Sequence, residues 1–226
     1  QTDLKRILAY TTMSVLGMLT LLIGLGTQLS LKAMVVFLLG HALYKAALFM
    51  TAGSVDHEAG TRDVTLLGGL RKAMPLTAAA AGLAALSKAG FPPLFGFIGK
   101  EYVYKSGTAL DSLAPLFVAV MLCGNLLLMA LAFKAGVHPY WSKASQTALP
   151  KHPHEAPWSM WLPPLLLAVL GLLLGLFPQA FMGPLVTAAA SAAAGRPIEA
   201  TLALWHGVNL PLILSGLTFA AGLTVY

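Results

Sequence analysis

The feature that most constrains this chain is a succession of long apolar runs. A helix that spans a bilayer needs about 20 apolar residues, and about seven runs of that order follow one another here. Only 10% of the 226 residues are charged, whereas soluble domains carry about 25%. The sequence therefore predicts an all-α integral membrane protein, a multi-span helical bundle, rather than a soluble domain.

The expected spans are separated by polar, glycine-rich or proline-rich connections. They cover residues 7–25, 33–54, 75–88, 91–105, 113–133, 160–177 and 204–226, with Ser30 as an expected cap of the second. Residues 134–158 are an expected loop, and the Ala- and Gly-rich stretch 178–203 is expected to form an interfacial helix and a turn. The chain begins with Gln1 and stops within an apolar run, so we expect a piece of a longer polypeptide.

Basic residues occur mostly between the expected spans, as is common in membrane proteins. This distribution, and not nucleic-acid binding, accounts for the formal charge of +6. If every span crosses the bilayer, residues 1–6, 55–73, 105–112 and 178–203 share one side, and Lys32, Lys134, Lys143 and Lys151 lie on the other. The resulting bias is weak, so the sequence alone does not predict an orientation.

The second expected span carries two ionisable side chains in its middle, His41 and Lys45. They are one helical turn apart and therefore share a helix face. Ionisable groups at this depth are costly and usually face a protein interior or a water-filled path. Lys45 is also about 10 residues from either end of the span, too far for its amine to reach an interface easily. We expect this helix to line a proton or ion pathway; a hydrogen-bonded core histidine is the alternative for His41.

The stretch GFPPLFGFIGKE, residues 90–101, opposes a continuous helix, because proline lacks the backbone donor and clashes with the preceding turn. Non-helical backbone at membrane depth is tolerated only where protein or a water-filled cavity surrounds it, and transporters place ion sites at broken helices. Residues 91–105 are therefore predicted to be one broken transmembrane helix that carries Lys100. Glu101 is expected to pair with Lys100 or Lys105, and Lys88 is either a second relay group or an interfacial anchor.

Several polar groups outside the spans are weak candidates for ion binding. Carboxylates suit Na⁺, and mixtures of Asp and His suit transition metals, but charged loop residues are commonly solvated. The loop 55–73 holds most of these groups, and a His-Pro-His sequence in the loop 134–158 is a weaker metal signal: Asp56, His57, Glu58, Asp63, His152 and His154.

Other motifs favour structural roles. The single cysteine, Cys123, lies in an apolar run and is expected to be a small core residue. Gly171 and Gly175 form a Gly-x-x-x-Gly pair that permits close helix approach and is a candidate contact face for another membrane protein. The sequence contains no nucleophile–base set, phosphate loop or nucleotide fingerprint, so we expect neither covalent chemistry nor an organic cofactor.

Four contiguous stretches resemble the second half of the antiporter-like membrane subunits. These subunits occur in respiratory complex I and in multisubunit Na⁺/H⁺ antiporters of the Mrp type. The stretches are QTDLKRILAYTTMS (1–14), GHALYKAALF (40–49), GGLRK (68–72) and GFPPLFGFIGKE (90–101). The loop DHEAGTRD (56–63) resembles the family of large A-type subunits of the Mrp antiporters specifically. The resemblance is dense to about residue 105, loose to residue 134 and thin beyond it.

This resemblance implies a core of two inverted five-helix repeats, each with a broken helix that carries a central charged residue. Residues 1–134 would be the second repeat, and residues 135–226 a loop and the additional transmembrane helices of a C-terminal extension. By family position Lys45 is the pathway lysine of the intact helix, Lys100 is the lysine of the broken helix, and His41 is a pathway histidine. Many relatives carry another histidine where this sequence has Phe37.

The resemblance also implies a multi-pass subunit of the bacterial inner (cell) membrane. Its implied partners are other membrane subunits of a hetero-oligomeric complex, the lipid bilayer, and H⁺ with Na⁺ or another monovalent cation. In that role Lys45, His41 and Lys100 would exchange protons through water along a track roughly parallel to the membrane plane, coupled to Na⁺ export. A lysine relays protons near neutral pH only if burial lowers its pKa from about 10.4.

Two other interpretations stay open. The first is a proton-pumping subunit of a complex I-type or hydrogenase-type enzyme, without redox chemistry of its own; the loop 56–63 argues against it by resemblance. The second is a structural membrane scaffold whose polar groups only hold neighbouring subunits. A relay predicts hydrated lysines, whereas a scaffold predicts dry, ion-paired lysines, so the partners of Lys45 and Lys100 distinguish the two.

Overall fold

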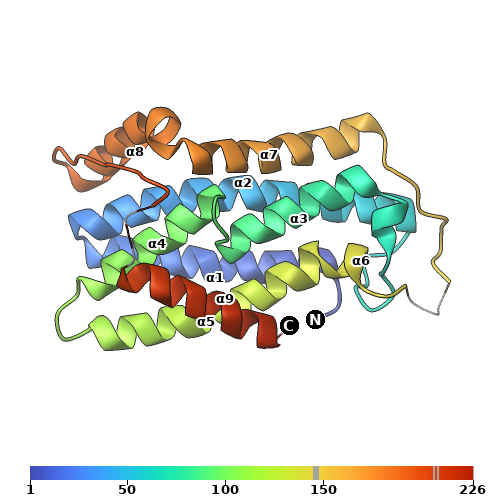
Figure 1. Ribbon diagram of the computed structural model, residues 1–226, viewed down its shortest axis with the longest axis horizontal. Coiled ribbons are helices and arrows are strands. Elements are labelled where there is room, and N and C mark those ends of the chain that lie inside the picture. The colour runs from blue at the N-terminus through green and yellow to red at the C-terminus, as the bar shows by residue number, and fades with distance from the viewer. Residues whose placement is uncertain (145–147, 206, 208, 226) are drawn as a thin grey trace.

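The computed structural model describes residues 1–144, 148–205, 207 and 209–225, and within them the chain is a helical bundle (Figure 1). The elements are α1 (Leu4–Leu25), α2 (Gln28–Ala59), a 3₁₀ turn η1 (Leu70–Lys72), α3 (Pro75–Ala89), α4 (Phe95–Thr108), α5 (Ala114–Gly136), α6 (His138–Trp141), α7 (Trp158–Leu176), α8 (Pro178–Ala194) and α9 (Leu210–Val225). An isolated bridge between Asp3 and Asp63 joins the start of the chain to the connection after α2. The predicted all-α class is confirmed.

Four of the described helices are long and apolar enough to cross a membrane: α1, α2, α5 and α7. Helix α9 is apolar but has only 16 residues. Helix α2 has 32 residues, about 48 Å at 1.5 Å per residue, so it exceeds a hydrocarbon core of about 30 Å. The starts of α1 and α2 are capped by the preceding residue: Asp3 accepts from the Arg6 N–H, and Thr27 forms a capping box with Ser30. The cap of α2 is therefore Thr27, one turn before the expected Ser30.

The predicted break is present, but it divides a different stretch from the one expected. Helices α3 and α4 have 15 and 14 residues, each shorter than the roughly 20 residues of a complete span. Figure 1 shows them end to end along the long axis of the bundle. Gly90 ends α3 with a left-handed φ of 75°, and the peptide bond between Pro92 and Pro93 is cis. The stretch 75–88, expected to be a span of its own, is thus the first half of the broken helix.

This correction changes which connections share an end of the bundle. The start of α1, the end of α2, the start of α3 and α6 lie at one end in Figure 1, whereas the α1–α2 turn and the end of α4 lie at the other. The assignment of connections to sides in the sequence analysis counted α3 and α4 as two separate crossings. It therefore placed connections from opposite ends of the bundle on one side. We call the first end the basic end; its Lys and Arg residues are Lys5, Arg6, Arg62, Arg71, Lys72, Lys134, Lys143 and Lys151. The opposite end has Lys32, Lys105 and Arg196.

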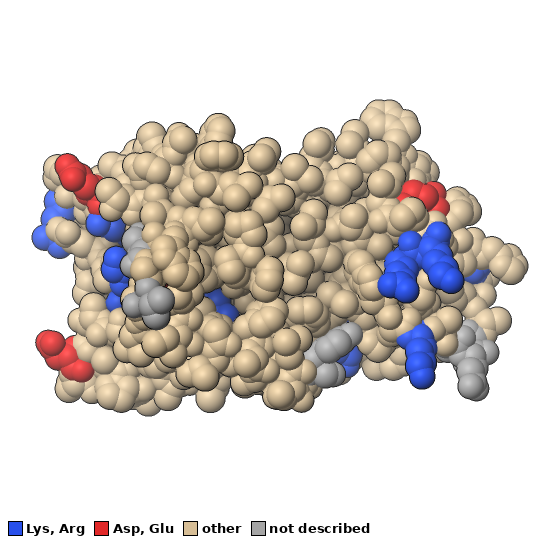
Figure 2. Space-filling model, viewed as in Figure 1, with Lys and Arg blue, Asp and Glu red and all other residues tan. Residues whose placement is uncertain are grey.

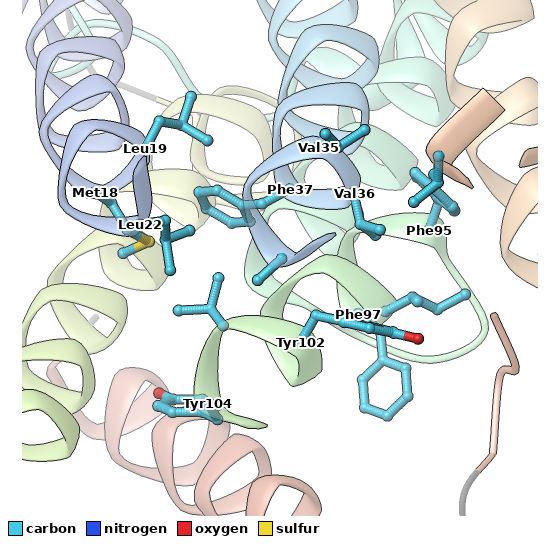
Figure 3. Packing of buried hydrophobic residues seen from close by; sticks show 14 of the residues in the cluster. Met18, Leu19, Leu22, Val35, Val36, Phe37, Phe95, Phe97, Tyr102 and Tyr104 are labelled. Atoms are coloured by element: carbon cyan, nitrogen blue, oxygen red, sulfur yellow. The ribbon is translucent and has the colours of Figure 1, made fainter. Parts of the chain in front are cut away.

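The main hydrophobic cluster lies where α1, α2 and α4 meet (Figure 3). Phe37 of α2 packs in this cluster with Leu19 of α1 and Phe97 of α4. Glycine allows α2 and α4 to approach closely: a Cβ on Gly99 would lie 3.1 Å from the Phe37 Cα. The phenyl ring at position 37, where many relatives are expected to have histidine, is therefore part of the apolar packing that holds α4 against α2.

Two other expectations are wrong. Cys123 is exposed on α5 and is not a core residue. The Gly171–Gly175 pair of α7 does not form a free face for a partner, because a Cβ on Gly175 would collide with Pro93 and Leu94 of this chain and Gly171 faces Ser87. The small residues of α7 thus let it pack directly on the break, where unpaired backbone needs protein cover.

Candidate functional site

Lys45 lies in the middle of α2 and is buried, with an exposed fraction of 5%. Its amine donates to the Leu8 carbonyl and to the Thr11 hydroxyl, the latter at 2.5 Å, both on α1. The Phe49 ring, one turn further along α2, lies 5.6 Å from the amine. The predicted mid-span lysine therefore points to α1, and the acceptors that the structure describes for it are neutral oxygens.

Lys88 occupies the last turn of α3, directly before the break. Its amine donates to the same Thr11 hydroxyl at 3.2 Å. The sequence left open whether Lys88 is a relay group or an interfacial anchor. Its amine lies against the middle of α1, beside Lys45, and not at an end of the bundle. Lys45 and Lys88 thus reach one oxygen from two different helices.

Lys100 lies on α4, on the other side of the break from Lys88, and is 4% exposed. Its amine donates to the Ala89 carbonyl at 3.2 Å, one of the carbonyls at the negative C-terminal end of α3. The side chain passes over Gly90, where a Cβ would lie 2.5 Å from the Lys100 Cδ. Gly90 is therefore required twice, for its left-handed backbone and for the space that the Lys100 side chain occupies.

His41 is buried one turn before Lys45, as its spacing predicted. Its Nδ1 lies 3.1 Å from the Tyr44 hydroxyl, and the two rings form an edge contact. This hydrogen bond stays within α2 and does not reach a lysine. The structure thus brings Lys45, Lys88 and Lys100 into one region along the broken helix, with His41 on the same segment of α2 as Lys45.

Glu101 follows Lys100 and faces the start of α9. Asn209 donates to its carboxylate at 3.2 Å, and the neighbouring Tyr102 donates to the Thr201 carbonyl at 2.6 Å. Lys105, one of the partners expected for Glu101, lies over the Tyr102 ring at 5.8 Å. The bonds of Glu101 and Tyr102 tie α4 to the segment that leads into α9.

The weak candidates for ion binding lie at the basic end and are held by other side chains. Asp56, His57 and Glu58 form the last turn of α2, which continues to Ala59, and not the loop expected for them. Asp56 pairs with Lys5 at 3.0 Å, and Glu58 lies between His57 at 2.8 Å and His154 at 3.2 Å. Among the described residues no group of three or more His, Cys, Asp and Glu side chains is arranged to hold a metal ion.

Asp63 takes part in a local turn rather than in this cluster. Its carboxylate accepts from the Thr65 hydroxyl at 2.7 Å and from the Thr65 N–H at 3.0 Å. These hydrogen bonds lower the pKa of Asp63 below its usual value, because they favour the charged form. His152 lines a shallow surface pocket beside Gly68 and Lys151.

Two groups of polar residues at the site were not predicted from the sequence. Thr11 contacts two of the three lysines, but a threonine in an apolar helix carries no signal that distinguishes it from its neighbour Thr12. A second group links α4, α5 and α9: the Tyr104 hydroxyl lies 2.7 Å from the Thr218 hydroxyl and accepts from Asn125 at 3.1 Å. Asn125 was the available signal for it, because a buried amide requires partners.

Comparison with known proteins places this arrangement in context. Residues 1–124 match the family described as "NADH:quinone oxidoreductase/Mrp antiporter, TM". Over 233 residues the chain is 38% identical to the probable K(+)/H(+) antiporter A/B subunit of Rhizobium meliloti, covering 100% of this chain and 23% of that protein. Over 239 residues it is 37% identical to the Na(+)/H(+) antiporter A1 subunit of Staphylococcus haemolyticus, covering 96% of this chain and 30% of that protein.

Two solved structures of membrane complexes contain chains with a similar fold. A chain in the structure of the Mrp complex from Dietzia sp. DQ12-45-1b superposes with a TM-score of 0.84 and 37% identity, covering 100% of this chain and 24% of that chain. A chain of respiratory complex I from Thermus thermophilus superposes with a TM-score of 0.72 and 26% identity, covering 86% of this chain and 40% of that chain. This chain thus spans between about a quarter and a third of the length of the antiporter subunits that it matches.

Proposed function

We propose that this chain, which belongs to the NADH:quinone oxidoreductase/Mrp antiporter transmembrane family, is the part of a cation/proton antiporter subunit that conducts protons along Lys45, Lys88 and Lys100. The observation that carries the proposal is the chemistry of the partners of these lysines. Among the described residues each amine donates to backbone carbonyls or a hydroxyl, and none donates to a carboxylate that would hold its charge. Neutral partners favour the relay interpretation over a scaffold of buried ion pairs.

The mechanism follows from charge in a medium of low dielectric constant. A buried ammonium without a carboxylate partner is costly, and two ammonium groups close together repel each other more strongly than they would in water. Protonation of one lysine therefore disfavours protonation of its neighbour, and a proton arriving at one favours release from the next. Water completes the steps that these side chains do not bridge. His41, buried one turn from Lys45, supplies a further titratable group.

The cation and the partners follow from the relatives only by analogy. Among the relatives, one is named for K⁺/H⁺ antiport and another for Na⁺/H⁺ antiport. We propose a monovalent cation, with Na⁺ export as the first case to test, and other membrane subunits as partners. The protein itself carries out secondary transport and no covalent chemistry. In this proposal the three lysines conduct protons within this segment, and cation movement through the complex is coupled to that conduction.

The complex I likeness supports a second candidate, a subunit of a proton-pumping oxidoreductase. The same three lysines would serve it, because both classes conduct protons. The two candidates differ in what drives the protons: a cation gradient moves them in an antiporter, whereas electron transfer in partner subunits moves them in an oxidoreductase. Proton movement in response to added Na⁺ or K⁺, without a redox substrate, therefore separates the two.

We also propose that the basic end faces the cytoplasm of a bacterial cell. Cytoplasmic connections of membrane proteins carry an excess of Lys and Arg, and most of the Lys and Arg residues outside the bundle interior lie at that end. In Figure 2, Lys and Arg side chains, drawn in blue, lie at both ends of the molecule, and the face between the two ends is mostly uncharged. An impermeant thiol reagent applied to intact cells is expected to label Glu199→Cys and to leave Ser142→Cys unlabelled; the reverse result would invert the orientation.

The test of the proposed function uses the whole complex in inverted membrane vesicles. Addition of Na⁺ or K⁺ should collapse a preformed proton gradient, and Lys100→Ala should reduce the initial rate by roughly a hundredfold, the low end for a positioned proton-transfer group. Lys105→Ala, on the same helix but exposed, is the matched control and should retain the rate. If Lys100→Ala assembles and transports normally, the lysine is structural and the scaffold interpretation replaces the relay.

A further inference from the structure

The hydroxyl of Thr11 is the one point that the structure describes where two of the three interior lysines meet. Its oxygen accepts from the Lys45 amine at 2.5 Å and from the Lys88 amine at 3.2 Å. Its own proton is donated to the Leu8 carbonyl at 3.0 Å. The side chain is 1% exposed. A hydroxyl has one donor and two acceptor sites, so all of its hydrogen-bonding capacity is used in this contact.

We propose that Thr11 is the positioning residue that connects Lys45 to Lys88, and that Lys88 thereby joins the intact helix α2 to the broken helix. This inference rests on the proposed function and extends it by one residue, Thr11, and by the order of the three lysines. The three groups come from α2, α1 and α3, and Lys88 directly precedes Ala89, whose carbonyl accepts from Lys100. The amines therefore follow one another across the break in the order Lys45, Lys88, Lys100.

Proton transfer through a hydroxyl balances without any other reactant. When Lys45 is neutral, the Thr11 hydroxyl turns its hydrogen from the Leu8 carbonyl to the Lys45 nitrogen. The Lys88 ammonium then gives a proton to the Thr11 oxygen as the Thr11 proton leaves for Lys45. One N–H bond and one O–H bond break and one of each forms, and the restored hydroxyl has its new hydrogen directed toward Lys88. The two nitrogens lie within about 6 Å of each other, since both contact one oxygen, and at that distance two positive charges repel strongly in a protein interior. The arrangement thus favours one proton shared between two amines.

If Thr11 had only a structural role, its hydroxyl would need no contact beyond its own helix. The hydroxyl of a threonine inside a helix often bonds the carbonyl one turn earlier and simply satisfies itself. Thr12 does this, donating to the same Leu8 carbonyl at 3.0 Å, and the structure describes no lysine contact for it. The chain therefore offers a matched pair of neighbouring threonines on α1, which share a carbonyl and differ in whether they contact the two amines.

The experiment compares Thr11→Val, Thr11→Ser and Thr12→Val in the whole complex, in inverted vesicles. Valine keeps the shape of threonine and removes the hydroxyl, whereas serine keeps the hydroxyl. Thr11→Val should lower the rate of cation-driven proton movement by at least about tenfold, and Thr11→Ser and Thr12→Val should retain most of it. The ratio of rates in H₂O and D₂O should change for Thr11→Val only, which a packing defect would not produce.

Lys88→Gln provides a second readout, because glutamine can still donate to Thr11 but cannot carry the proton. It should lose transport as Thr11→Val does, and the double variant should be no slower than the slower single variant, since residues of one path are not additive. If Thr11→Val fails to assemble, Lys88→Gln alone decides the question. Transport at the wild-type rate in assembled Thr11→Val or Lys88→Gln overturns the inference. If Thr11→Val alone transports normally, only this inference fails. Normal transport by Lys88→Gln also removes Lys88 from the proposed path, and normal transport by Lys100→Ala overturns the proposed function itself.

Discussion

Two lysines join the same pair of helices, α1 and α2, in opposite ways. At the basic end, Lys5 of α1 reaches Asp56 of α2 at 3.0 Å, and the two side chains are 38% and 35% exposed. In the middle of the bundle, Lys45 of α2 reaches the Leu8 carbonyl and the Thr11 hydroxyl of α1 and is 5% exposed. The first lysine is neutralised by a carboxylate where water also stabilises it. The second is buried, and the partners that the structure describes for it are uncharged oxygens.

Other charged residues of the basic end and of the bundle interior differ in the same way. Arg62 joins Asp3 at 3.2 Å and Lys5 joins Asp56, so that these two carboxylates of the basic end each have a cationic partner. In the interior, each of the three lysines reaches only neutral oxygens in the contacts that the structure describes. Exposed ion pairs contribute little to the free energy of unfolding. Interior lysines with neutral partners keep the freedom to gain and lose a proton, which is what a relay requires.

The largest effect that tests this contrast is expected from the same substitution at the two lysines. Lys45→Met should lower the antiport rate by roughly a hundredfold or more, while folding stability stays equal or rises, because an apolar side chain replaces a buried charge. Lys5→Met should keep the antiport rate and cost about 0–1 kcal/mol of stability, less in high salt. Vesicle transport and urea unfolding of the purified complex measure the two quantities. A strong transport defect in Lys5→Met, or a large loss of stability in Lys45→Met, would break the comparison.

Gly90 gives the next largest effect, because it shapes the interior region directly. Gly90→Ala introduces a side chain at a left-handed residue, which costs roughly 1–2 kcal/mol, and the new Cβ pushes against the Lys100 side chain. We expect the antiport rate to fall by about tenfold as Lys100 is displaced from the Ala89 carbonyl.

Gly53→Ala is the control for this substitution. Gly53 is inside α2, and a Cβ added there would have no neighbouring atom within 4 Å; alanine also favours a helix by about 0.5–1 kcal/mol over glycine. Transport by Gly53→Ala should equal that of the wild type. Equal transport by Gly90→Ala would mean that the placement of Lys100 at the break does not matter for conduction.

Much of the fold could be predicted because apolar length and helix breakers are local signals. The long helices α1, α2, α5 and α7 lie close to their expected ranges, and the break after Gly90 follows from its prolines and glycines. What the sequence did not separate is a short complete span from half of a broken one. The stretch 75–88 begins with Pro75 and ends at Gly90, as a complete helix does; only its alignment with α4 identifies it as a half (Figure 1).

Some residues of the candidate site could also be predicted from local signals, and others could not. Lys45 and Lys100 were selected because a charge in an apolar run is costly wherever it packs, whereas Lys88 was left open between a relay group and an interfacial anchor. Thr11 was not selected, because its partners are 34 and 77 residues away in the chain, and a threonine on an apolar helix becomes informative only when packing shows what it contacts. The weak ion-binding candidates Asp56, His57 and Glu58 were selected by composition; their spatial partners, such as Lys5, were not visible in the sequence. Whether those three residues bind an ion stays a prediction.

The smallest effect is expected at the first turn of α3, where a side chain of the basic end contacts the broken helix. Glu155 of the connection before α7 accepts from the Leu76 N–H at 2.6 Å and from the Thr77 hydroxyl at 2.5 Å. A carboxylate at a helix N-terminus satisfies free donors and interacts favourably with the helix dipole. Glu155→Ala should therefore loosen the first turn of α3 by about 1–2 kcal/mol and leave the antiport rate nearly unchanged, since Lys88 lies at the opposite end of the helix.

Hydrogen exchange at the start of α3 measures this local effect, because a loss of about 1.4 kcal/mol raises the exchange rate of locally opening amides by about tenfold. Glu199→Ala, an exposed carboxylate at the opposite end of the bundle, is the matched control and should leave exchange in α3 unchanged. Faster exchange that spreads through α3 to the break, together with a loss of transport, would contradict the division between the two regions. It would mean that the charges of the basic end set the position of Lys88, and that the two regions act as one unit.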